Sequence, residues 1–417
     1  MQRSETVEIR GHLLDTGVLT RCVDDVLSLG GDYVIEKFVV GRDHGDESYA
    51  RIRVEADDDA RLDSILMRLN AHGVNLTDPG EARIRVVEAD GVFPDDFYST
   101  TNLGTQVRTG GGHWVDVQQP EMDCGLVVTG EGAQSQVRTI PVSDVRAGDR
   151  IVCGAAGVRV VVPVAAYPED GADGEIFEFM NSEVSSEKPQ ALLVRQIADE
   201  MRATKAAGQR ILWVAGPAVV HTGAAPAMVA LVEAGYLDVL FGGNAIATHD
   251  IESSLYGTSL GVDLTKGRGV EHGHEHHIRA INQIRRAGSI AAAVEQGVLT
   301  GGVMHSLVQH DKAFVLVGSV RDDGPLPDVI TDVIDGQRAM RAELHDVGFA
   351  IMVATMLHSV ATGNLLPAAV PLVCVDINPA TVTKLADRGS SQARGVVTDI
   401  GLFLEQLAGE LTPGWRS

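Results

Sequence analysis

Carboxylates and a histidine stand directly after two apolar segments of this sequence, in positions suited to moving protons. Asp322 and Asp323 follow AFVLVGS (313–319). Two neighbouring carboxylates in a cleft raise each other's pKa, which suits a group that gives and takes a proton. The alternative is a solvated turn. His249 follows VLFGG (239–243) in the first turn of a predicted helix. It contacts a cofactor or a substrate there, unless this segment only caps the helix.

Glycine-rich turns offer backbone N–H groups to a phosphate. The turn GPAVVHTGA follows ILWVA (211–215), and we expect a helix to begin near Ala224 with its N-terminus free for a pyrophosphate. Because the pattern is not G-x-G-x-x-G, a plain strand-to-helix turn is the alternative. The predicted cofactor contacts of this turn and of the turn after 239–243 are Gly216, Pro217, Ala218, Thr222, Gly223, Gly243, Asn244 and Ala245.

An aspartate ends the apolar segment that begins at residue 371. An acidic side chain at a strand end accepts hydrogen bonds from the ribose of NAD and disfavours the extra phosphate of NADP, so Asp376 is a cofactor candidate. An aspartate that only caps a helix or a turn is the alternative. The polar residues of this turn and of the next strand end complete the predicted cofactor set: Asn378, Thr398 and Asp399.

Three further charged residues are candidates to bind a substrate. Arg108 is a potential clamp for a carboxylate, although an isolated surface arginine looks the same in a sequence. Glu183 and Lys188 lie at a predicted domain junction, where ligand pockets often form; the alternative is the start of a helix. The histidine run EHGHEHH (271–277) is a weak metal signal, because zinc needs convergent ligands, and we predict no metal.

The order of the predicted elements indicates an α/β protein with three domains. Residues 1–92 read β-α-β-β-α-β, with a last strand at 82–87, which is the order of a ferredoxin-like α+β module. Residues 93–185 hold short β-rich segments between Gly, Pro and Asp turns, typical of a small β-barrel or an open antiparallel sheet. From 186 to 417, apolar strands alternate with helices, which predicts a doubly wound, Rossmann-like sheet.

Composition limits the partners and the compartment. The 417 residues include 57 Asp and Glu against 34 Lys and Arg, a net charge of −23. A chain this acidic repels phosphate backbones, so we expect no nucleic acid, but a small molecule and other copies of the chain. Four cysteines without a C-x-x-C pair predict thiols in a reducing compartment. No apolar run reaches the roughly 20 residues that span a bilayer, so we expect a cytoplasmic protein with no membrane partner.

Several longer segments together resemble one protein family. They are EMDCGLVV, GPAVVHTGA, NAIATHDIE, LYGTSLG, SVRDDGPLPDVITDV, ATMLHSVATGN and VCVDINPATVTKLADRGSSQA. From residue 5 to residue 410 the chain resembles the LOR/SDH-domain family of archaeal-type, NAD-dependent ornithine cyclodeaminases. It is also similar to the C-terminal part of cyanobacterial bifunctional arginine dihydrolase/ornithine cyclodeaminases. The resemblance implies NAD as the cofactor and a last domain similar to the NAD-binding fold of deoxyhypusine synthase.

The same resemblance implies a redox-neutral reaction from L-ornithine to L-proline and ammonia. The substrate would lose a hydride from its α-carbon to NAD, its δ-amine would displace ammonia, and the same cofactor would reduce the ring. Two alternatives remain: an NAD-linked amino-acid dehydrogenase with net NADH production, and a protein that senses NAD and an amino acid without turnover. A homo-oligomer is the expected assembly.

Roles for the candidates follow from this reaction, by residue type and location. The proton carrier is Asp322 or Asp323, with His249 and His221 as alternatives. His221 is also a candidate to bind the substrate. Arg108 and Lys188 hold the substrate carboxylate in this scheme, and Glu183 meets the distal ammonium.

Overall fold

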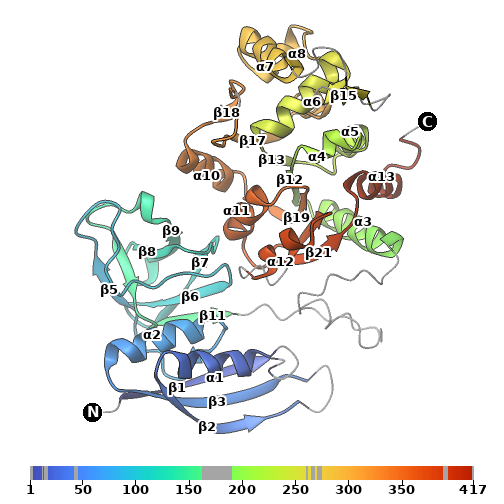
Figure 1. Cartoon of the computed structure of the whole chain (residues 1–417). Helices are drawn as coiled ribbons and strands as arrows, with labels where there is room; N and C mark the ends of the chain where they lie inside the picture. Colours follow the sequence, from blue (N-terminus) through green and yellow to red (C-terminus); the bar gives the residue numbers. More distant parts are fainter. Residues whose placement is uncertain are drawn as a thin grey trace. The chain divides into compact units, whose positions relative to one another are not determined.

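The computed structural model divides the chain into two compact units (Figure 1). It describes residues 3–11, 13, 17–41, 46–161, 190–259, 262–263, 268–269, 275–322, 324–387 and 393–415. Unit 1 holds residues 1–183 together with 364–369, and unit 2 holds 184–363 and 370–417. The boundary predicted between residues 185 and 186 lies outside the described residues and stays a prediction.

The first part of unit 1 has the predicted ferredoxin-like order. Its elements are β1 (Arg3–Gly11), α1 (Val18–Ser28), β2 (Asp32–Val39), β3 (Ser48–Ala56), α2 (Asp59–Asn70) and β4 (Asn75–Leu76). They build an antiparallel sheet in the order β2-β3-β1-β4. Alternate residues of β3, such as Ile52 and Val54, are buried in a core shared with both helices, as the period of two along a strand requires.

The strand predicted at 82–87 forms, but it belongs to another sheet. β5 (Arg83–Val86) pairs antiparallel with β10 (Arg150–Cys153), and the two-residue β4 takes the fourth place in the first sheet. A strand as short as β4 shows no alternation of apolar and polar residues. The sequence pattern therefore favoured the longer segment after it.

The second part of unit 1 is β-rich, as predicted. Its sheet has the order β11-β6-β7-β9-β8-β10-β5. The remaining strands are β6 (Gly104–Thr109), β7 (His113–Gln118), β8 (Gly125–Thr129), β9 (Gln136–Ile140) and β11 (Val158–Val161). Asn75 joins the two sheets, because its amide donates to the carbonyl of Val160 at 2.9 Å and accepts the Val160 N–H at 2.8 Å.

Unit 1 also contains a segment from late in the chain, which the sequence did not predict. The N–H of Ala368 donates to the carbonyl of Asn102 at 2.8 Å, and the N–H of Met122 donates to that of Asn364 at 3.1 Å. The Asn102 side chain returns a bond to the Leu366 carbonyl at 3.3 Å. Asn102 and Leu366 are buried, so residues 364–369 are part of the interior of this unit.

Unit 2 alternates strands and helices. Its first half comprises α3 (Gln190–Ala206), β12 (Arg210–Ala215), α4 (Ala218–His221), α5 (Ala225–Glu233), β13 (Val239–Gly243), α6 (Asn244–Tyr256), β14 (Thr258–Ser259), β15 (Val262–Asp263), β16 (Arg268–Gly269), α7 (His276–Ala287), α8 (Ile290–Glu295) and α9 (Val303–Gln309). Its second half comprises β17 (Ala313–Val317), β18 (Val329–Ile330), α10 (Val333–Ala342), β19 (Val347–Val353), α11 (Leu357–Leu365), β20 (Leu372–Asp376), α12 (Pro379–Asp387), β21 (Ala393–Val397) and α13 (Ile400–Leu411).

The centre of unit 2 is the predicted doubly wound sheet. Its strands are parallel in the order β18-β17-β13-β12-β19-β20-β21. In Figure 1, α10, α11 and α12 lie on one side of the sheet and α3, α5 and α13 on the other. Trp213 of β12 is fully buried in the core that α3, α5 and α13 share. Strands covered on both faces have uniformly apolar sequences, which is why these segments carried no charge.

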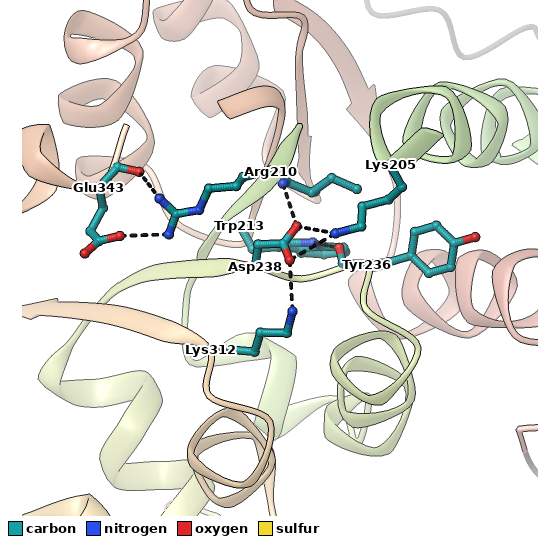
Figure 2. A network of polar contacts seen from close by, with 8 residues as sticks. Lys205, Arg210, Trp213, Tyr236, Asp238, Lys312 and Glu343 are labelled. Atoms are coloured by element: carbon teal, nitrogen blue, oxygen red, sulfur yellow. Dashed lines mark hydrogen bonds and ion pairs between the residues drawn. The ribbon is translucent and has the colours of Figure 1, made fainter. Parts of the chain in front are cut away.

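A charged network ties the amino ends of these strands together (Figure 2). The carboxylate of Asp238, just before β13, accepts hydrogen bonds from Nζ of Lys205 at 2.9 Å and from Nζ of Lys312 at 2.9 Å. It also accepts one from the N–H of Ile211 at 3.0 Å. Burial alone would raise the pKa of Asp238, but the Ile211 N–H and the two ammonium groups lower it below its ordinary value. The carboxylate therefore stays ionised, and it stabilises the end of the sheet opposite the candidate site.

Candidate active site

The sheet of unit 2 has one topological switch point, between β12 and β19. The chain leaves β12 towards β13 and β17, and it returns on the other side at β19. Because the loops after these two neighbouring strands diverge, ligands of such sheets bind outside their carboxyl ends. The backbones approach closely here: the N–H of Gly216 donates to the Val353 carbonyl at 2.9 Å. Ala354 has a φ of 54°, a strained conformation of the kind that clusters at ligand sites.

Replacing Gly216 by alanine is expected to destabilise the protein by about 1–3 kcal/mol or more, because a Cβ there would stand 1.9 Å from the Ala354 carbonyl oxygen. The measurement is the urea midpoint at an unchanged m-value. Gly409→Ala in α13 is the matched control. No atom lies within 4 Å of its new Cβ, so it should instead stabilise the helix by about 0.5–1 kcal/mol. Equal midpoints for the two variants would show that the close approach is not real.

The connection from β19 through α11 to β20 corresponds to the first strand, helix and second strand of a dinucleotide fold. In that fold the phosphates lie at the first turn, and an acid about 20 residues further on binds a ribose. The equivalent turn here begins at Ala354, and the equivalent acid is Asp376 at the end of β20. Asp376 is only 9% exposed, and one of its carboxylate oxygens accepts the Asn378 N–H at 2.8 Å.

The turn after β19 was missed in the sequence because it contains no glycine. Its first residue adopts a positive φ as an alanine, Ala354, so the pattern search found the glycines after β12 instead. Those glycines line the other side of the same switch point. Because Gly216 has no Cβ, its backbone lies directly against the Ala354 carbonyl, and no side chain separates the two turns at this point. Exposed backbone N–H groups at such a turn suit a pyrophosphate.

His358 in α11, which was not predicted from the sequence, lies at the same carboxyl edge of the sheet. A Cβ on Gly243 would be 3.1 Å from its ring, and the ring bonds to the Val317 carbonyl at the end of β17. Burial lowers the pKa of His358 below its ordinary value, although the Val317 carbonyl and the nearby Asp322 favour its charged form. His358 thus joins Gly243 and Asp322, both predicted site residues.

Asp322 itself holds a turn together. One of its carboxylate oxygens accepts the Ser319 N–H at 2.9 Å, and the other accepts the Ser319 hydroxyl at 3.3 Å. Its carboxylate lies close enough to His358 to favour the charged form of that ring, but the bonds to Ser319 already engage both oxygens. Its predicted partner in proton transfer, Asp323, lies outside the described residues.

A histidine network lies between α4 and α6. The His221 and His249 rings meet edge to face with centroids 4.8 Å apart. Nδ1 of His249 contacts a carboxylate oxygen of Glu252 at 2.8 Å, and Nδ1 of His221 contacts the hydroxyl of Ser259 at 2.6 Å. Glu252 is completely buried, so its carboxyl group bonds to protein partners, such as His249, rather than to water. A carboxylate on one ring nitrogen fixes the tautomer and leaves the other nitrogen of His249 as a proton acceptor.

The network continues towards α7. The Thr258 hydroxyl donates to Glu252 at 2.9 Å and contacts Nδ1 of His276 at 2.8 Å, and the His276 ring stacks on Tyr256. Burial, and then the neighbouring His249, lower the pKa of His221 below its ordinary value, while Glu252 opposes this shift. His221 is therefore neutral at pH 7. The cluster can accept and pass a proton, because it combines the neutral imidazole of His221 with the buried carboxyl group of Glu252.

His249 lies in the second turn of α6 rather than in the first, because the helix begins at Asn244. The next residue, Asp250, has a different role. Its carboxylate accepts the N–H groups of Val303 and Met304 at 2.8 Å each, and burial raises its pKa to about 6. Asp250 therefore fixes the first turn of α9, whereas His249 belongs to the histidine network.

The other predicted cofactor residues lie at the carboxyl edge of the sheet with structural contacts of their own. Asn244 does not cap α6; its side-chain oxygen accepts the Leu326 N–H at 3.0 Å. Thr222 bonds back to the Ala218 carbonyl, and Asp399 caps α13 through the Leu402 N–H. The helix expected near Ala224 is preceded by a short one, α4, which follows Gly216 and Pro217 directly. Gly223, Ala245, Asn378 and Thr398 occupy the turns or helix starts after β12, β13, β20 and β21.

The substrate candidates are less well placed. Glu183 and Lys188 lie outside the described residues. Arg108 belongs to unit 1, where it lines a cavity of about 700 Å³ together with Arg10, Trp114 and Arg159. Its buried Nε has no hydrogen-bond partner within the described part of the chain, so it is available to an anion.

Among the described residues, no group of three or more His, Cys, Asp or Glu side chains is arranged to hold a metal ion, and His272 and His274 of the histidine run lie outside these residues. None of the described helices is both long enough and apolar enough to cross a membrane.

Three family descriptions match consecutive parts of the chain. Residues 4–103 match the LOR/SDH bifunctional enzyme conserved region. Residues 104–194 match the first C-terminal region of ArgZ-like arginine dihydrolases, and residues 195–407 match the C-terminal Rossmann fold of the same proteins.

Individual relatives cover nearly the whole chain. The ornithine cyclodeaminase of Methanothermobacter thermautotrophicus is 51% identical over 405 residues, 97% of each protein. The structure of apo ArgZ, an arginine dihydrolase of cyanobacteria, matches with a TM-score of 0.83 and 37% identity over 98% of this chain and 58% of its own. A ternary complex of AgrE with ornithine and NAD+ matches with a TM-score of 0.52 and 40% identity, over 98% of this chain and 57% of its own.

Proposed function

We propose, from the premise that this chain belongs to the ornithine cyclodeaminase family with the LOR/SDH conserved region, that it converts L-ornithine to L-proline and ammonia with NAD as a recycled cofactor. The observation that carries the proposal is the 51% identity to an ornithine cyclodeaminase over 97% of both chains. The geometry of unit 2 supports it, since a doubly wound sheet with a topological switch point and a histidine network lie in one unit.

The residues at the switch point fit the cofactor. The backbone of Gly216 and of the turn at Ala354, which approach each other closely, would hold the pyrophosphate. Asp376 would hold the ribose of the adenosine half, and a carboxylate at this position would also disfavour NADP. When bound, NAD supplies a hydride acceptor and donor for the substrate α-carbon, so that oxidation and reduction cancel within one turnover.

The chain's own part in the reaction is proton transfer and positioning. Glu252 holds Nδ1 of His249, and the remaining ring nitrogen takes a proton from the substrate α-amine and returns one to the departing ammonia. His221, neutral and bonded to Ser259, keeps the His249 ring in place and provides a second acceptor. Because Glu252 is completely buried, its contact with His249 is shielded from water.

The proposal also assigns residues to substrate binding. Arg108 and Lys188 hold the substrate carboxylate, Glu183 holds the distal ammonium, and Asp322 or Asp323 shares in proton transfer. Support for Arg108 is its buried and unpartnered Nε. For Asp322, the support is its closeness to His358.

The decisive experiment is an incubation of the purified protein with L-ornithine and a trace of NAD. We expect proline and ammonia in equal amounts, many turnovers per NAD and no lasting absorbance of NADH. NADH that accumulates with product would replace this proposal by the amino-acid dehydrogenase. NAD binding without any product would favour the sensing protein.

The assembly and the compartment belong to the same proposal. The protein acts as a homo-oligomer in the cytoplasm. All four cysteines are buried as thiols, which suits a reducing compartment. Support for the oligomer is an apolar edge strand in unit 1.

A further inference from the structure

β2 is an unusual edge strand. It is the terminal strand of its sheet, so its outer row of N–H and C=O groups faces away from β3. Its apolar side chains are poorly covered in the described part of the chain: Ile35 is 41% exposed, Phe38 38% and Val39 47%. Edge strands of soluble proteins are normally short, charged or covered, because a long apolar edge pairs with other strands. Such an edge needs a partner.

The sequence of β2 is complementary to itself when read in the opposite direction. In Tyr-Val-Ile-Glu-Lys-Phe-Val-Val (33–40), an antiparallel copy centred between Glu36 and Lys37 sets Glu36 opposite Lys37. The flanking pairs are then apolar: Ile35 opposite Phe38 and Val34 opposite Val39. Opposite charges and apolar side chains that face each other across strands stabilise a sheet.

An irregularity in β2 makes this pairing geometrically consistent. Two residues that face each other about a two-fold axis normal to the sheet must point to the same face. In a regular strand, residues of odd and even number point to opposite faces. The register with β3 shifts between Ile35 and Lys37, so Ile35 and Phe38 both stand opposite buried residues of β3. The bulge at Glu36 thus puts Ile35 and Phe38 on the same face of the sheet, as the two-fold pairing requires.

The bulge also places both charges on the other face. Val34 and Val39 pair with Arg53 and Tyr49 of β3, and these lie on the face that the helices do not cover. Glu36 contacts Arg53 at 3.4 Å and Lys37 lies over the Tyr49 ring, so both central charges are on that face. The Glu36 side chain remains 38% exposed within one chain, which leaves room for a second partner.

We propose that two copies of this chain join through antiparallel pairing of their β2 strands, centred between Glu36 and Lys37, into one continuous eight-stranded sheet. The occupant of the edge is a second copy because the charge pattern fits itself under a two-fold rotation, the symmetry of most dimers. This rests on the proposed homo-oligomer but not on the proposed reaction. Leu27 and Leu29, exposed just before β2, extend the apolar surface beside the strands.

The test uses two single charge reversals of the full chain and their mixture, with mass measured by light scattering. In Glu36→Lys each new lysine faces the partner's Lys37, and in Lys37→Glu each new glutamate faces the partner's Glu36. In each variant alone, the Kd for association of two copies should rise at least about tenfold. The measured mass should then fall to half that of the wild type. Mixed in equal amounts, they should associate again, because a mixed pair has opposite charges at both positions.

The mixture separates pairing from damage to the fold, since a misfolded chain is not rescued by another variant. Asp32→Lys is the control: it adds the same charge to β2 but faces Gly41 in this register, and it should keep the wild-type mass. A monomeric wild type overturns both the oligomer and the interface. An oligomeric wild type whose mass neither reversal changes, or reversals that do not associate when mixed, overturns the interface alone.

Discussion

Replacing His249 by alanine is expected to lower the turnover of ornithine about 10²–10⁴-fold, the usual contribution of a positioned proton carrier. The reason is geometric: among the histidines of the network, His249 is the one whose Nδ1 contacts the buried Glu252, and His221 meets its ring only edge to face. NAD affinity should remain unchanged, because the switch point lies on other elements. The measurement is kcat for proline formation beside the Kd for NAD.

His345→Ala is the matched control, since it removes an exposed histidine of the same unit and should leave kcat within about twofold. Glu252→Gln tests positioning: the amide keeps the shape but no longer fixes the tautomer, so kcat should fall while KM changes little. Full turnover of both His249→Ala and Glu252→Gln would remove the histidine network from the mechanism.

The pH profile gives an independent readout of the same cluster. Burial and His249 hold the pKa of His221 below the ordinary 6.5, so its neutral form predominates at pH 7. The midpoint of its protonation lies below pH 6.5, and turnover should fall on that acidic side. An acid limb centred above pH 6.5 would assign the loss to another group.

The second large effect is expected on cofactor binding. Asp376→Asn should raise the Kd for NAD about 10–150-fold, because a hydrogen bond to a charged group contributes about 1.5–3 kcal/mol. It should also narrow the preference for NAD over NADP, since the charge that repels the extra phosphate is lost. Titration calorimetry with both dinucleotides measures the two effects.

Asp332→Asn is the control for this substitution. Asp332 is another aspartate after a strand of the same sheet, and its carboxylate caps α10 through the N–H groups of Ile334 and Asp335. Asparagine caps a helix equally well, so both affinities should stay unchanged. If Asp376→Asn binds NAD as tightly as Asp332→Asn does, the ribose lies elsewhere.

The sequence predicted the parallel sheet well because strands buried on both faces are uninterrupted apolar segments. It also predicted Asp376 at a strand end, since that position depends only on where the apolar segment stops. It missed Ala354 because a positive φ at an alanine leaves no trace in residue type. His358 and Glu252 were missed for a related reason, as each stands within a helix whose pattern says nothing about what the side chain meets.

Short strands and contacts between distant segments were also not predicted from the sequence. The two-residue β4 has no readable period, so the fourth strand of the first sheet was assigned to β5. The hydrogen bond between Ala368 and Asn102 joins two segments that are far apart in the sequence, and neither local sequence predicts this contact. Such contacts are fixed by tertiary packing alone.

That last contact sets the order in which the protein can be made. During synthesis the N-terminal unit emerges first and can begin to fold while the rest of the chain is still being added. Its interior, however, includes Leu366 and the bonds from Asn102, which exist only after residue 369 has left the ribosome. The first unit therefore waits, partly open, for nearly the entire second unit to be translated. The protein matures as one piece late in synthesis, although it is built from parts that look separable.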